Sequence, residues 1–559
     1  MSIKTLDGKR FAEMVIQGAN HLSANAKYVD ALNVFPVPDG DTGTNMNLSI
    51  TSGAKEVKNN VQDHIGKVGS ALSKGLLMGA RGNSGVILSQ LFRGFSKAIE
   101  QKATISAEEF AAALDAGVAT AYKAVMKPVE GTILTVAKDA AKKAVEVAKH
   151  KDDIISVMED VLKEAKASLN RTPDLLPVLK EVGVVDSGGQ GLVFVYEGFL
   201  AELKGEKLAP STSLPSMDEL VSAEHHMNVA GHVNTEDIEF GYCTEFMVKL
   251  DEEKVQHHPF SETDFRQDLS KYGDSLLVIA DEQLVKVHIH AEEPGEVLTY
   301  AQRYGSLVNM KIENMREQHT NLLSESLPPI KTEAPAKSKE KLEYGIVTVS
   351  MGSGIAELFK SIGAHAVIEG GQTMNPSTED IVKAIKDINA KKVIILPNNK
   401  NIIMAAQQAA DVADEEVIVI PSKTVPQGMS ALLAFNPGTD LQSNEQGMTD
   451  ALQNVKTGQI TYAVRDTSID GLEIEKDDFM GIADGKIVVK NKDKVLSAKE
   501  LLSAMLDEDS EILTILKGEE ASDEEVNALV EFVESEYEDV EIEIHDGKQP
   551  LYSFIFSIE

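Results

Sequence analysis

The sequence predicts a multidomain protein with an all-α N-terminal part, a central α+β segment and a C-terminal α/β part. Three observations lead to this fold class. Apolar residues at helical spacing fill about the first 200 residues without an alternating strand pattern. Two proline-containing polar stretches then interrupt the chain, and from Tyr344 onward strand patterns alternate with helical ones. A chain of 559 residues is also longer than one hydrophobic core can serve.

The N-terminal helices show both start signals and apolar faces. Ser106 and Glu109 have the spacing of a capping box, which predicts a helix beginning there. Apolar residues then recur every three or four positions, at Phe110, Leu114, Val118, Tyr122 and Val125. Glycine-rich stretches separate such helices. We therefore expect an α-helical bundle whose loops gather at one end.

Composition changes divide the chain into three domains joined by two linkers. The predicted pieces are a helical domain at 1–203, a linker at 204–236, a central domain at 237–325, a linker at 326–342 and an α/β domain at 343–559. The prolines should keep the linkers extended, and the flanking domains should be able to move.

The central domain has the element order βαββαβ, which is typical of a ferredoxin-like sheet. Its strands are predicted at Tyr242–Leu250, Ser275–Ala280, Leu284–His290 and Leu307–Ile312, with helices at Ser261–Lys271 and Pro294–Tyr304.

The C-terminal domain begins with a strand, a glycine turn and a helix start within Gly345–Gly354. The apolar runs Lys392–Asn399 and Glu416–Pro421 predict further strands of a mainly parallel sheet. Ser350 and Asn398 follow such strands, at the edge where open α/β sheets bind ligands. The last ~100 residues should form a second subdomain.

Charge and composition narrow the partners. The chain has 54 basic and 89 acidic residues, a formal net charge of −35, which argues against binding nucleic acid or anionic membranes. From Leu501 to Glu559 there are 18 acidic and 2 basic residues. This segment is either a solubilising surface or an acidic face for a basic protein.

Nothing in the sequence predicts a membrane span or export. No apolar run approaches the ~18 residues that a spanning helix needs. The polar start and the single cysteine, Cys243, indicate the reducing cytoplasm and no stable membrane insertion.

The sharpest motif is the loop Asn33–Met46, with the sequence NVFPVPDGDTGTNM. Asp39 and Asp41 stand two residues apart between glycines and prolines, so both can turn toward one cation. Hard carboxylate oxygens suit Mg²⁺, which commonly shares the oxygens of a phosphate.

Three further glycine-containing loops precede helical patterns. In Met78–Val86, Gly82 and Gly85 let backbone N–H groups approach a phosphate, and Ser84 adds a hydroxyl. The other two loops are Lys127–Thr132 and Val185–Gly191. The chain has neither a Walker motif nor the motifs of protein kinases, so a nucleotide site would be of another kind.

The central domain contains one cysteine and two histidines at alternating positions. Cys243, His288 and His290 leave the apolar side of their strands. They could bind Zn²⁺ with one open position, act directly as thiolate and imidazole, or be unrelated surface residues. We expect the first and third strands to be parallel neighbours. Cys243 and His290 would then meet only through an offset register.

The four loops, in this order on an all-helical domain, resemble the nucleotide-binding subunit of dihydroxyacetone kinases, the DhaL family, over about residues 8–200. The resemblance implies a helical barrel that holds ATP or ADP through two Mg²⁺ ions. It places Asp39 and Asp41 on two carboxylate ligands and Asn33 where the family has a third carboxylate. The implied nucleotide-side residues are Thr44, Asn45, Gly82, Ser84, Gly85, Thr132, Asp186 and Gly188.

Over its whole length the chain resembles the FakA family of fatty acid kinases, on its FPVPDGDTGTNMNLS string, its Cys/His middle domain and its α/β tail. The resemblance implies phosphoryl transfer from ATP to a fatty acid held by a DegV-type carrier protein, giving acyl phosphate. It also implies a DegV-like tail, a homodimer formed by the middle domain, and a need for Cys243, His288 and His290 in catalysis. We expect the tail to dock the carrier rather than to bind lipid itself.

Three alternatives stay open. The chain could be a small-polyol kinase like the dihydroxyacetone enzymes, although no hydroxyketone-binding domain is evident. It could be a zinc-binding scaffold whose helical domain senses nucleotide. It could also be a phosphatase, which would release phosphate without a carrier.

Overall fold

The computed structural model forms two compact units, Met1–Ser211 together with Glu340–Glu559, and Thr212–Lys339. The helical and C-terminal parts therefore belong to one unit, which the predicted linkers did not suggest. The structure describes residues 2–34, 40–125, 127–206, 242–251, 254–255, 260–269, 271–280, 284–314, 341–371, 374–469 and 471–559. Both predicted linkers lie almost entirely outside these residues.

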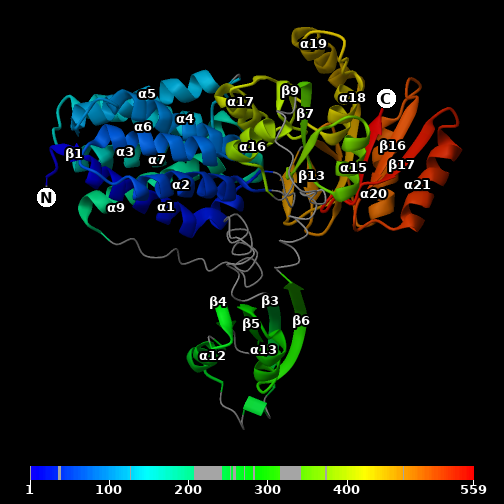
Figure 1. The fold of residues 1–559 in the computed structure, drawn as a ribbon, viewed down its shortest axis with the longest axis horizontal. Coiled ribbons are helices and arrows are strands. Elements are labelled where there is room, and N and C mark those ends of the chain that lie inside the picture. The colour runs from blue at the N-terminus through cyan, green and yellow to red at the C-terminus, as the bar shows by residue number, and fades with distance from the viewer. Residues whose placement is uncertain are drawn as a thin grey trace, which may run out of the picture. The chain divides into compact units, whose positions relative to one another are not determined.

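The N-terminal part is the predicted helical bundle (Figure 1). Its helices are α1 (Gly8–Asp30), α2 (Thr42–Asn59), α3 (Ile65–Gly79), α4 (Gly82–Ile99), α5 (Ala107–Ala124), α6 (Ile133–Ala148), α7 (Ile154–Leu175), α8 (Pro177–Val182) and α9 (Ser187–Lys204). Their apolar faces meet in one core around Phe11, Phe110 and Phe199. The capping box of Ser106 and Glu109 is present at the start of α5.

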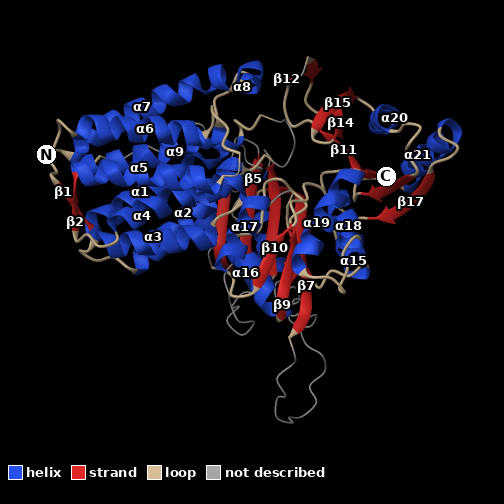
Figure 2. Cartoon of the chain, turned by 90° about the horizontal axis from the view of Figure 1, so that it is seen from above, coloured by secondary structure: helices blue, strands red, loops and turns tan. Residues whose placement is uncertain are grey.

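The all-α prediction missed two short strands in this part. β1 (Thr5–Asp7) and β2 (Thr104–Ser106) pair antiparallel, with Leu6 opposite Ile105 and both side chains buried. Three residues are too few to show the period of two that reveals a strand. The pair lies at the end of the bundle away from the α/β part (Figure 2).

The C-terminal part begins with the predicted parallel sheet. Its strands are β7 (Leu342–Ser350), β8 (Ala366–Glu369), β9 (Ala390–Leu396) and β10 (Glu416–Val419), in the order β10-β9-β7-β8. All the pairings are parallel. Helices α16 (Thr378–Ile388) and α17 (Ile403–Val412) cover one face. Helices α15 (Ser353–Ser361), α18 (Val425–Leu433) and α19 (Leu441–Ala451) cover the other.

A second subdomain follows, as predicted, but its sheet is mostly antiparallel. The strand order is β15-β14-β11-β18-β16-β17, and only β16 and β17 pair in parallel. The strands are β11 (Lys456–Tyr462), β14 (Phe479–Ala483), β15 (Lys486–Asn491), β16 (Ile512–Lys517), β17 (Glu541–Asp546) and β18 (Phe554–Ile558). Helices α20 (Lys494–Met505) and α21 (Asp523–Glu536) pack on this sheet, and β12 (Thr467–Ile469) and β13 (Leu472–Ile474) form a separate hairpin.

The helical bundle packs against the parallel-sheet subdomain through α16 and α17 (Figure 2). Ala80 and Val86 of the bundle join the apolar core of these helices. The buried side chain of Gln408 in α17 lies at the centre of this contact. Its Oε1 accepts from Gln90 Nε2 at 2.7 Å and from Ser89 Oγ at 3.1 Å, and its Nε2 donates to the Leu77 carbonyl at 2.8 Å.

The second unit has the predicted order βαββαβ. It comprises β3 (Tyr242–Leu250), α12 (Glu262–Leu269), β4 (Gly273–Ala280), β5 (Leu284–Ala291), α13 (Pro294–Ala301) and β6 (Gly305–Asn314). The strand order is β4-β5-β3-β6, and every pairing is antiparallel. Our expectation that the first and third strands run parallel was wrong. In a split βαβ arrangement the intervening strand runs opposite to its neighbours.

Candidate functional site

Four helices of the bundle begin at the same end, where the predicted loops lie. A Cβ placed on Gly82 at the start of α4 would lie 2.6 Å from Asn45 Nδ2 in α2. A Cβ on Gly191 in α9 would lie 2.6 Å from the Met46 sulfur, and one on Gly188 would lie 3.3 Å from Ile133 Cβ in α6. The starts of α2, α4, α6 and α9 are therefore neighbours. Helix N-termini carry partial positive charge and unpaired N–H groups, so this end favours anions.

The start of α2 is held by a carboxylate that the sequence analysis missed. Asp30, the last residue of α1, accepts hydrogen bonds from Gly43 N at 2.6 Å, Thr44 N at 3.1 Å and Thr44 Oγ1 at 2.8 Å. Burial raises the pKa of Asp30, although these hydrogen bonds act the other way. A carboxylate at a helix C-terminus interacts unfavourably with the helix dipole. This unfavourable position was the one signal in the sequence that Asp30 forms hydrogen bonds to another helix.

Two of the three predicted metal ligands lie within the described residues. Asp41 directly precedes α2, and its backbone carbonyl accepts the first helical hydrogen bond from Asn45 N at 2.8 Å. Asn33 Oδ1 accepts a hydrogen bond from Thr42 Oγ1 at 2.6 Å, and Asn33 Nδ2 donates to the Asp30 carbonyl at 2.8 Å. Asp39 lies outside the described residues.

The loop before α4 fits closely against α2. Gly82 has a φ of +56°, a conformation that glycine adopts without strain. The hydroxyl of Ser49 in α2 accepts a hydrogen bond from Arg81 N at 3.1 Å, and a Cβ on Gly85 would lie 2.3 Å from this hydroxyl. Ser84 lies in the first turn of α4 and is half-buried. The glycines thus let the start of α4 pack closely against α2.

The loops Lys127–Thr132 and Val185–Gly191 lead into α6 and α9, whose starts lie next to each other. Thr132 precedes α6 and donates its hydroxyl to the Val129 carbonyl at 2.7 Å. Asp186 caps α9 by accepting from Gly189 N at 2.7 Å. Burial raises the pKa of Asp186 to about 6, despite hydrogen bonds from the backbone of Gly189 and Ile133 that act the other way.

The C-terminal part contributes residues to the Asp41 loop that the sequence analysis did not find. Asn375 Nδ2 donates to Asp41 Oδ2 at 2.6 Å, and Arg81 Nη1 donates to the Asn375 carbonyl at 2.7 Å. Arg465 donates to the backbone carbonyls of Ala31 and Asn33. These pairs are hundreds of residues apart in sequence, and no motif marks them.

A cavity of about 840 Å³ opens beside these contacts, a volume that suits a small-molecule ligand. Asn33, Asp41 and Ser187 line it from the helical part. From the α/β part it is lined by residues at the carboxyl ends of three parallel strands, namely Ser350 of β7, Gly371 after β8, and Asn399 and Lys400 after β9. The predicted ligand-binding edge of the parallel sheet and the loop of the predicted metal ligands therefore line the same cavity.

Asn398, singled out with this edge, has a structural role as well as its place in the cavity lining. Its Nδ2 donates to Thr348 Oγ1 at 2.7 Å and to the Val349 carbonyl at 2.9 Å, and its Oδ1 accepts from Ser422 Oγ at 2.8 Å. It ties together the ends of two strands.

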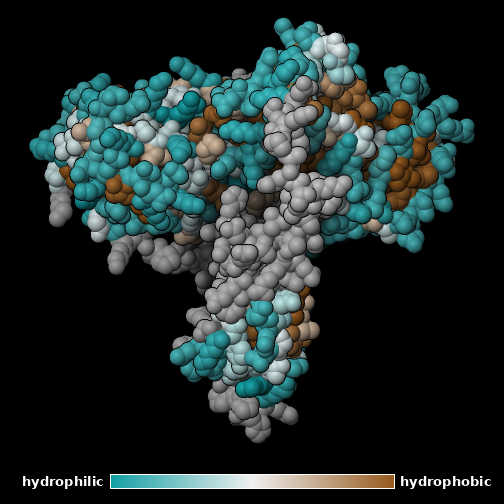
Figure 3. Space-filling view, in the orientation of Figure 1, coloured by the Kyte–Doolittle hydropathy of each residue, from teal (hydrophilic) through white to brown (hydrophobic). Residues whose placement is uncertain are grey.

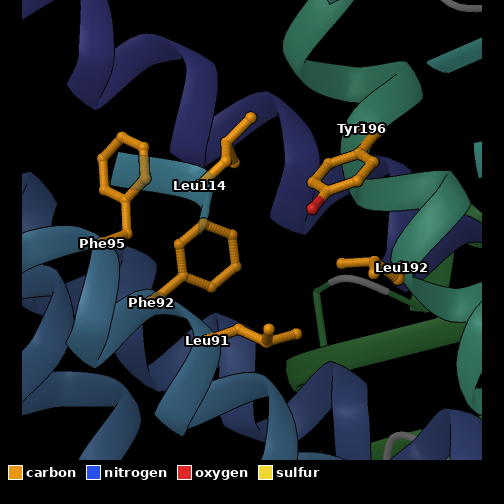
Figure 4. A pocket seen from close by; sticks show the side chains of 6 residues that line it. All are labelled: Leu91, Phe92, Phe95, Leu114, Leu192 and Tyr196. Carbon is orange, nitrogen blue, oxygen red and sulfur yellow. The ribbon is translucent and has the colours of Figure 1, made fainter. Parts of the chain in front are cut away.

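The interior of the bundle, as far as the structure describes it, offers no comparable site. A space of only about 10 Å³ lies among aromatic and leucine side chains, with the Tyr196 hydroxyl pointing toward it (Figure 4). Burial raises the pKa of this hydroxyl. The space has room for a water molecule at most.

The side-chain oxygens at the start of α2 are of the type that binds Mg²⁺. Carboxylate and amide oxygens are its usual protein ligands, and it keeps waters and phosphate oxygens for the remaining positions. Across the part of the chain that the structure describes, no three His, Cys, Asp or Glu residues form a metal-binding group. A complete Mg²⁺ site therefore needs Asp39 or nucleotide oxygens in addition. Among the described residues nothing supports a Zn²⁺ site, and the side chains of Cys243, His288 and His290 are not among these residues.

In the second unit the strand register brings the predicted Cys/His positions together. Cys243 on β3 is the register partner of His290 on β5, and Glu245 is the partner of His288. Because the strands are antiparallel, no offset is needed. The side chains of these residues lie outside the described part of the structure.

The helical fold and its four converging loops define the class of protein as one that contains a DAK2 domain. The DAK2 domain model matches residues 36–201. Two models of FakA-like fatty acid kinase proteins match the middle domain at 239–322 and the C-terminal domain at 345–559.

Curated relatives match over the full length. The chain is 67% identical to Protein YloV of Bacillus subtilis strain 168, covering 100% of both chains. It is 56% identical to uncharacterized proteins of Staphylococcus epidermidis and Staphylococcus aureus, again over 100% of both chains. The chain belongs to the FakA-like family of fatty acid kinase proteins. Its domains support a kinase of the DAK class.

Solved structures resemble separate parts of the chain. A DegV family protein from Corynebacterium glutamicum matches with 16% identity and a TM-score of 0.31, covering 39% of this chain and 96% of its own. The dihydroxyacetone kinase of C. freundii in complex with AMP-PNP and Mg²⁺ matches with 21% identity and a TM-score of 0.28, covering 34% of this chain and 33% of its own.

Among the helices in the described ranges, none combines the length and apolar character that crossing a membrane requires.

Proposed function

We propose that this chain is the ATP-dependent subunit of a fatty acid kinase, which phosphorylates the carboxylate of a fatty acid held by a DegV-type carrier protein and gives acyl phosphate. The observation that carries the proposal is the convergence of four helix N-termini, one of them directly after Asp41, in a DAK2 domain. Family membership supplies the choice of a fatty acid over other acceptors.

The helical part would bind the nucleotide by its phosphates. The residues proposed to contact the phosphates belong to the first turns of α2 and α4, and they are Thr44, Asn45, Gly82, Ser84 and Gly85. In our proposal the second pair of helix starts, with Thr132, Asp186 and Gly188, holds the rest of the nucleotide. The helix dipoles, together with N–H groups of these turns that Asp30 and Asp186 do not occupy, would stabilise the anion without a Walker lysine.

Asp41, Asn33 and Asp39 would hold two Mg²⁺ ions together with the phosphates. When bound, such ions neutralise charge on the oxygens of the group in transfer. Asn33 provides an uncharged oxygen, which leaves the carboxylates to supply the negative charge of the site. Asp30 anchors the turn through three hydrogen bonds and so fixes where these ligands stand.

The acceptor explains the absence of an obvious general base in the predicted motifs. A fatty acid carboxylate is already ionised near pH 7, so no proton has to be removed before it attacks. The chain has to orient the acceptor oxygen and shield the charges of two anions.

The middle domain would dimerise and supply Cys243, His288 and His290 at the transfer point. The register pairs Cys243 on β3 with His290 on β5, which supports joint action of these two residues.

The carrier would dock on the acidic end of the C-terminal part. β17 is the edge strand of its sheet, with Glu541 and Glu543 exposed and Ile544 48% exposed. Figure 3 shows apolar side chains among hydrophilic ones at this end of the molecule. Such a surface suits a basic partner with an apolar centre. We place the reaction in the cytoplasm, where ATP and a lone cysteine are both expected.

The test is transfer of the γ-phosphate of ATP to oleate loaded on a DegV-type carrier, with Mg²⁺, beside a dihydroxyacetone control. We expect carrier-dependent acyl phosphate from the wild type and none from Asp41→Ala. Phosphorylation of dihydroxyacetone instead would support the small-polyol alternative. Turnover retained by Asp41→Ala would remove the metal-ligand assignment.

A further inference from the structure

The contact between Asn375 and Asp41 joins the C-terminal part to the predicted metal ligand. Asn375 is 2% exposed, and its Nδ2 lies 2.6 Å from Asp41 Oδ2. The orientation of the amide follows from chemistry, because its oxygen would repel a carboxylate at this distance. A neutral donor holds the Asp41 carboxylate in place without cancelling the negative charge that attracts a cation.

The chain is held in place directly after Asn375. Pro376 follows directly and restricts the backbone of Asn375 to an extended conformation. Ser377 then caps α16 with a capping box, and Thr378 N donates to the Ala80 carbonyl at 3.1 Å. The Asn375 side chain therefore reaches Asp41 from a segment that is anchored to the helical bundle.

Asn375 also connects the two phosphate-side loops. Its carbonyl accepts from Arg81 Nη1 at 2.7 Å, while its side chain holds Asp41. A Cβ on Gly82 would lie 3.5 Å from Asn375 Nδ2. One residue of the α/β part thus contacts both the loop before α2 and the loop before α4.

The oxygen of the Asn375 side-chain amide has no role in the contact with Asp41. Within the described residues its Oδ1 is buried and has no hydrogen-bond partner. A buried acceptor without a donor costs free energy, which makes a purely structural role for this side chain inefficient. A ligand that brings a donor, such as a metal-bound water, would satisfy it.

We propose that Asn375 is a positioning residue of the metal site, which orients the Asp41 carboxylate through a hydrogen bond donated from the C-terminal part. Carboxylates that bind metals are themselves usually held by such outer hydrogen bonds, and losing one typically weakens metal binding by about 10- to 100-fold. This inference rests on the proposed function, because it assumes that Asp41 binds Mg²⁺ with the nucleotide. It adds that the helical part does not complete the site alone.

The test compares Asn375→Ala with Gln408→Ala in the full-length chain. Both substitutions remove buried hydrogen bonds from the same contact between the helical and α/β parts, but of the two residues only Asn375 touches Asp41. The readout is the Mg²⁺ concentration required for half-maximal binding of AMP-PNP in calorimetric titrations. We expect about a tenfold increase for Asn375→Ala and less than about a twofold change for Gln408→Ala.

Equal effects of the two variants would show that the packing of the two parts matters rather than the orientation of Asp41, and would overturn the proposal. A wild-type Mg²⁺ requirement in Asn375→Ala would also overturn it. If that variant does not fold, Asn375→Asp has the same shape and replaces the donor with an acceptor. We expect it to weaken Mg²⁺ binding, and tighter binding would contradict the donor role.

Asp41→Ala separates this inference from the proposed function. Loss of Mg²⁺-dependent binding in Asp41→Ala, with wild-type behaviour in Asn375→Ala, would remove only the role of Asn375. Wild-type binding in Asp41→Ala would remove the metal site itself.

Discussion

Replacing Asp186 with asparagine should stabilise the protein at pH 8 but hardly at pH 4. Burial raises the pKa of this carboxyl to about 6 from an ordinary value of 3.8. Between these two pH values the folded protein keeps a proton that the unfolded chain has lost. Stability from the protonated carboxyl is therefore present below about pH 4 and is lost as the pH rises through 6.

The size of the change in stability follows from the pKa shift of Asp186. A difference of about 2 pH units corresponds to about 3 kcal/mol of unfolding free energy at pH 8, and to less than about 1 kcal/mol at pH 4. Asparagine has the shape of the protonated carboxyl and can still cap α9 by accepting from Gly189 N. At about 2 °C per kcal/mol for a large unit, Tm should rise by about 6 °C at pH 8 and by about 1 °C at pH 4.

The assay is thermal unfolding followed by circular dichroism at both pH values. Asp153, which caps α7, is a matched control with the opposite sign. Desolvation acts to raise its pKa, but hydrogen bonds from Ile3 N and Ser156 outweigh it and hold the pKa below its ordinary value. Asp153→Asn should therefore destabilise at pH 8 and less so at pH 4. The same Tm difference for Asp186→Asn at both pH values would refute the reasoning.

The substitution also links stability to function. If Asp186 faces the nucleotide, as we propose, Asp186→Asn should lower nucleotide affinity while it raises Tm. Functional sites commonly keep such unfavourable groups at a cost in stability.

Substitutions at three further positions, two of them with a control variant, test the packing around the site by thermal unfolding. Gly43→Ala should prevent stable folding of the bundle, since its Cβ would lie 1.9 Å from the Ala26 carbonyl oxygen, whereas Gly447→Ala meets no atom within 4 Å and should stabilise α19 by up to about 1 kcal/mol. Asp30→Ala leaves three donors without their acceptor and should cost about 2–4 kcal/mol, and a loss below about 1 kcal/mol would show that water replaces the carboxylate. Ser377→Ala removes a capping box and should cost about 1 kcal/mol, with Ser377→Thr close to wild type.

Much of the helical part could be predicted because its signals are local. The capping box of Ser106 and the apolar stripe of α5 lie within one element, and both are present in the structure. The strands β1 and β2 were missed because each has three residues and depends on the other. The middle sheet shows the same division. The order βαββαβ was readable, whereas the antiparallel register that pairs Cys243 with His290 was not.

The candidate site divides in a similar way. Asp41, Gly82 and Asp186 were found because turn glycines and helix starts leave a pattern in the sequence around them. Asp30 was missed because its partners lie 13 and 14 residues further on, beyond the reach of a single turn.

The sequence by itself determined the helices of the bundle, the element order of the middle domain, the four loops and the acidic C-terminal end, because periodicity, capping and charge act between near neighbours. Only the tertiary structure decided that the α/β part packs on the loop end of the bundle. Asn375 reaches Asp41 across 334 residues, and the cavity beside them has walls from both parts. Contacts at such separation depend on how two folded surfaces fit, and a single sequence carries no local pattern for that fit.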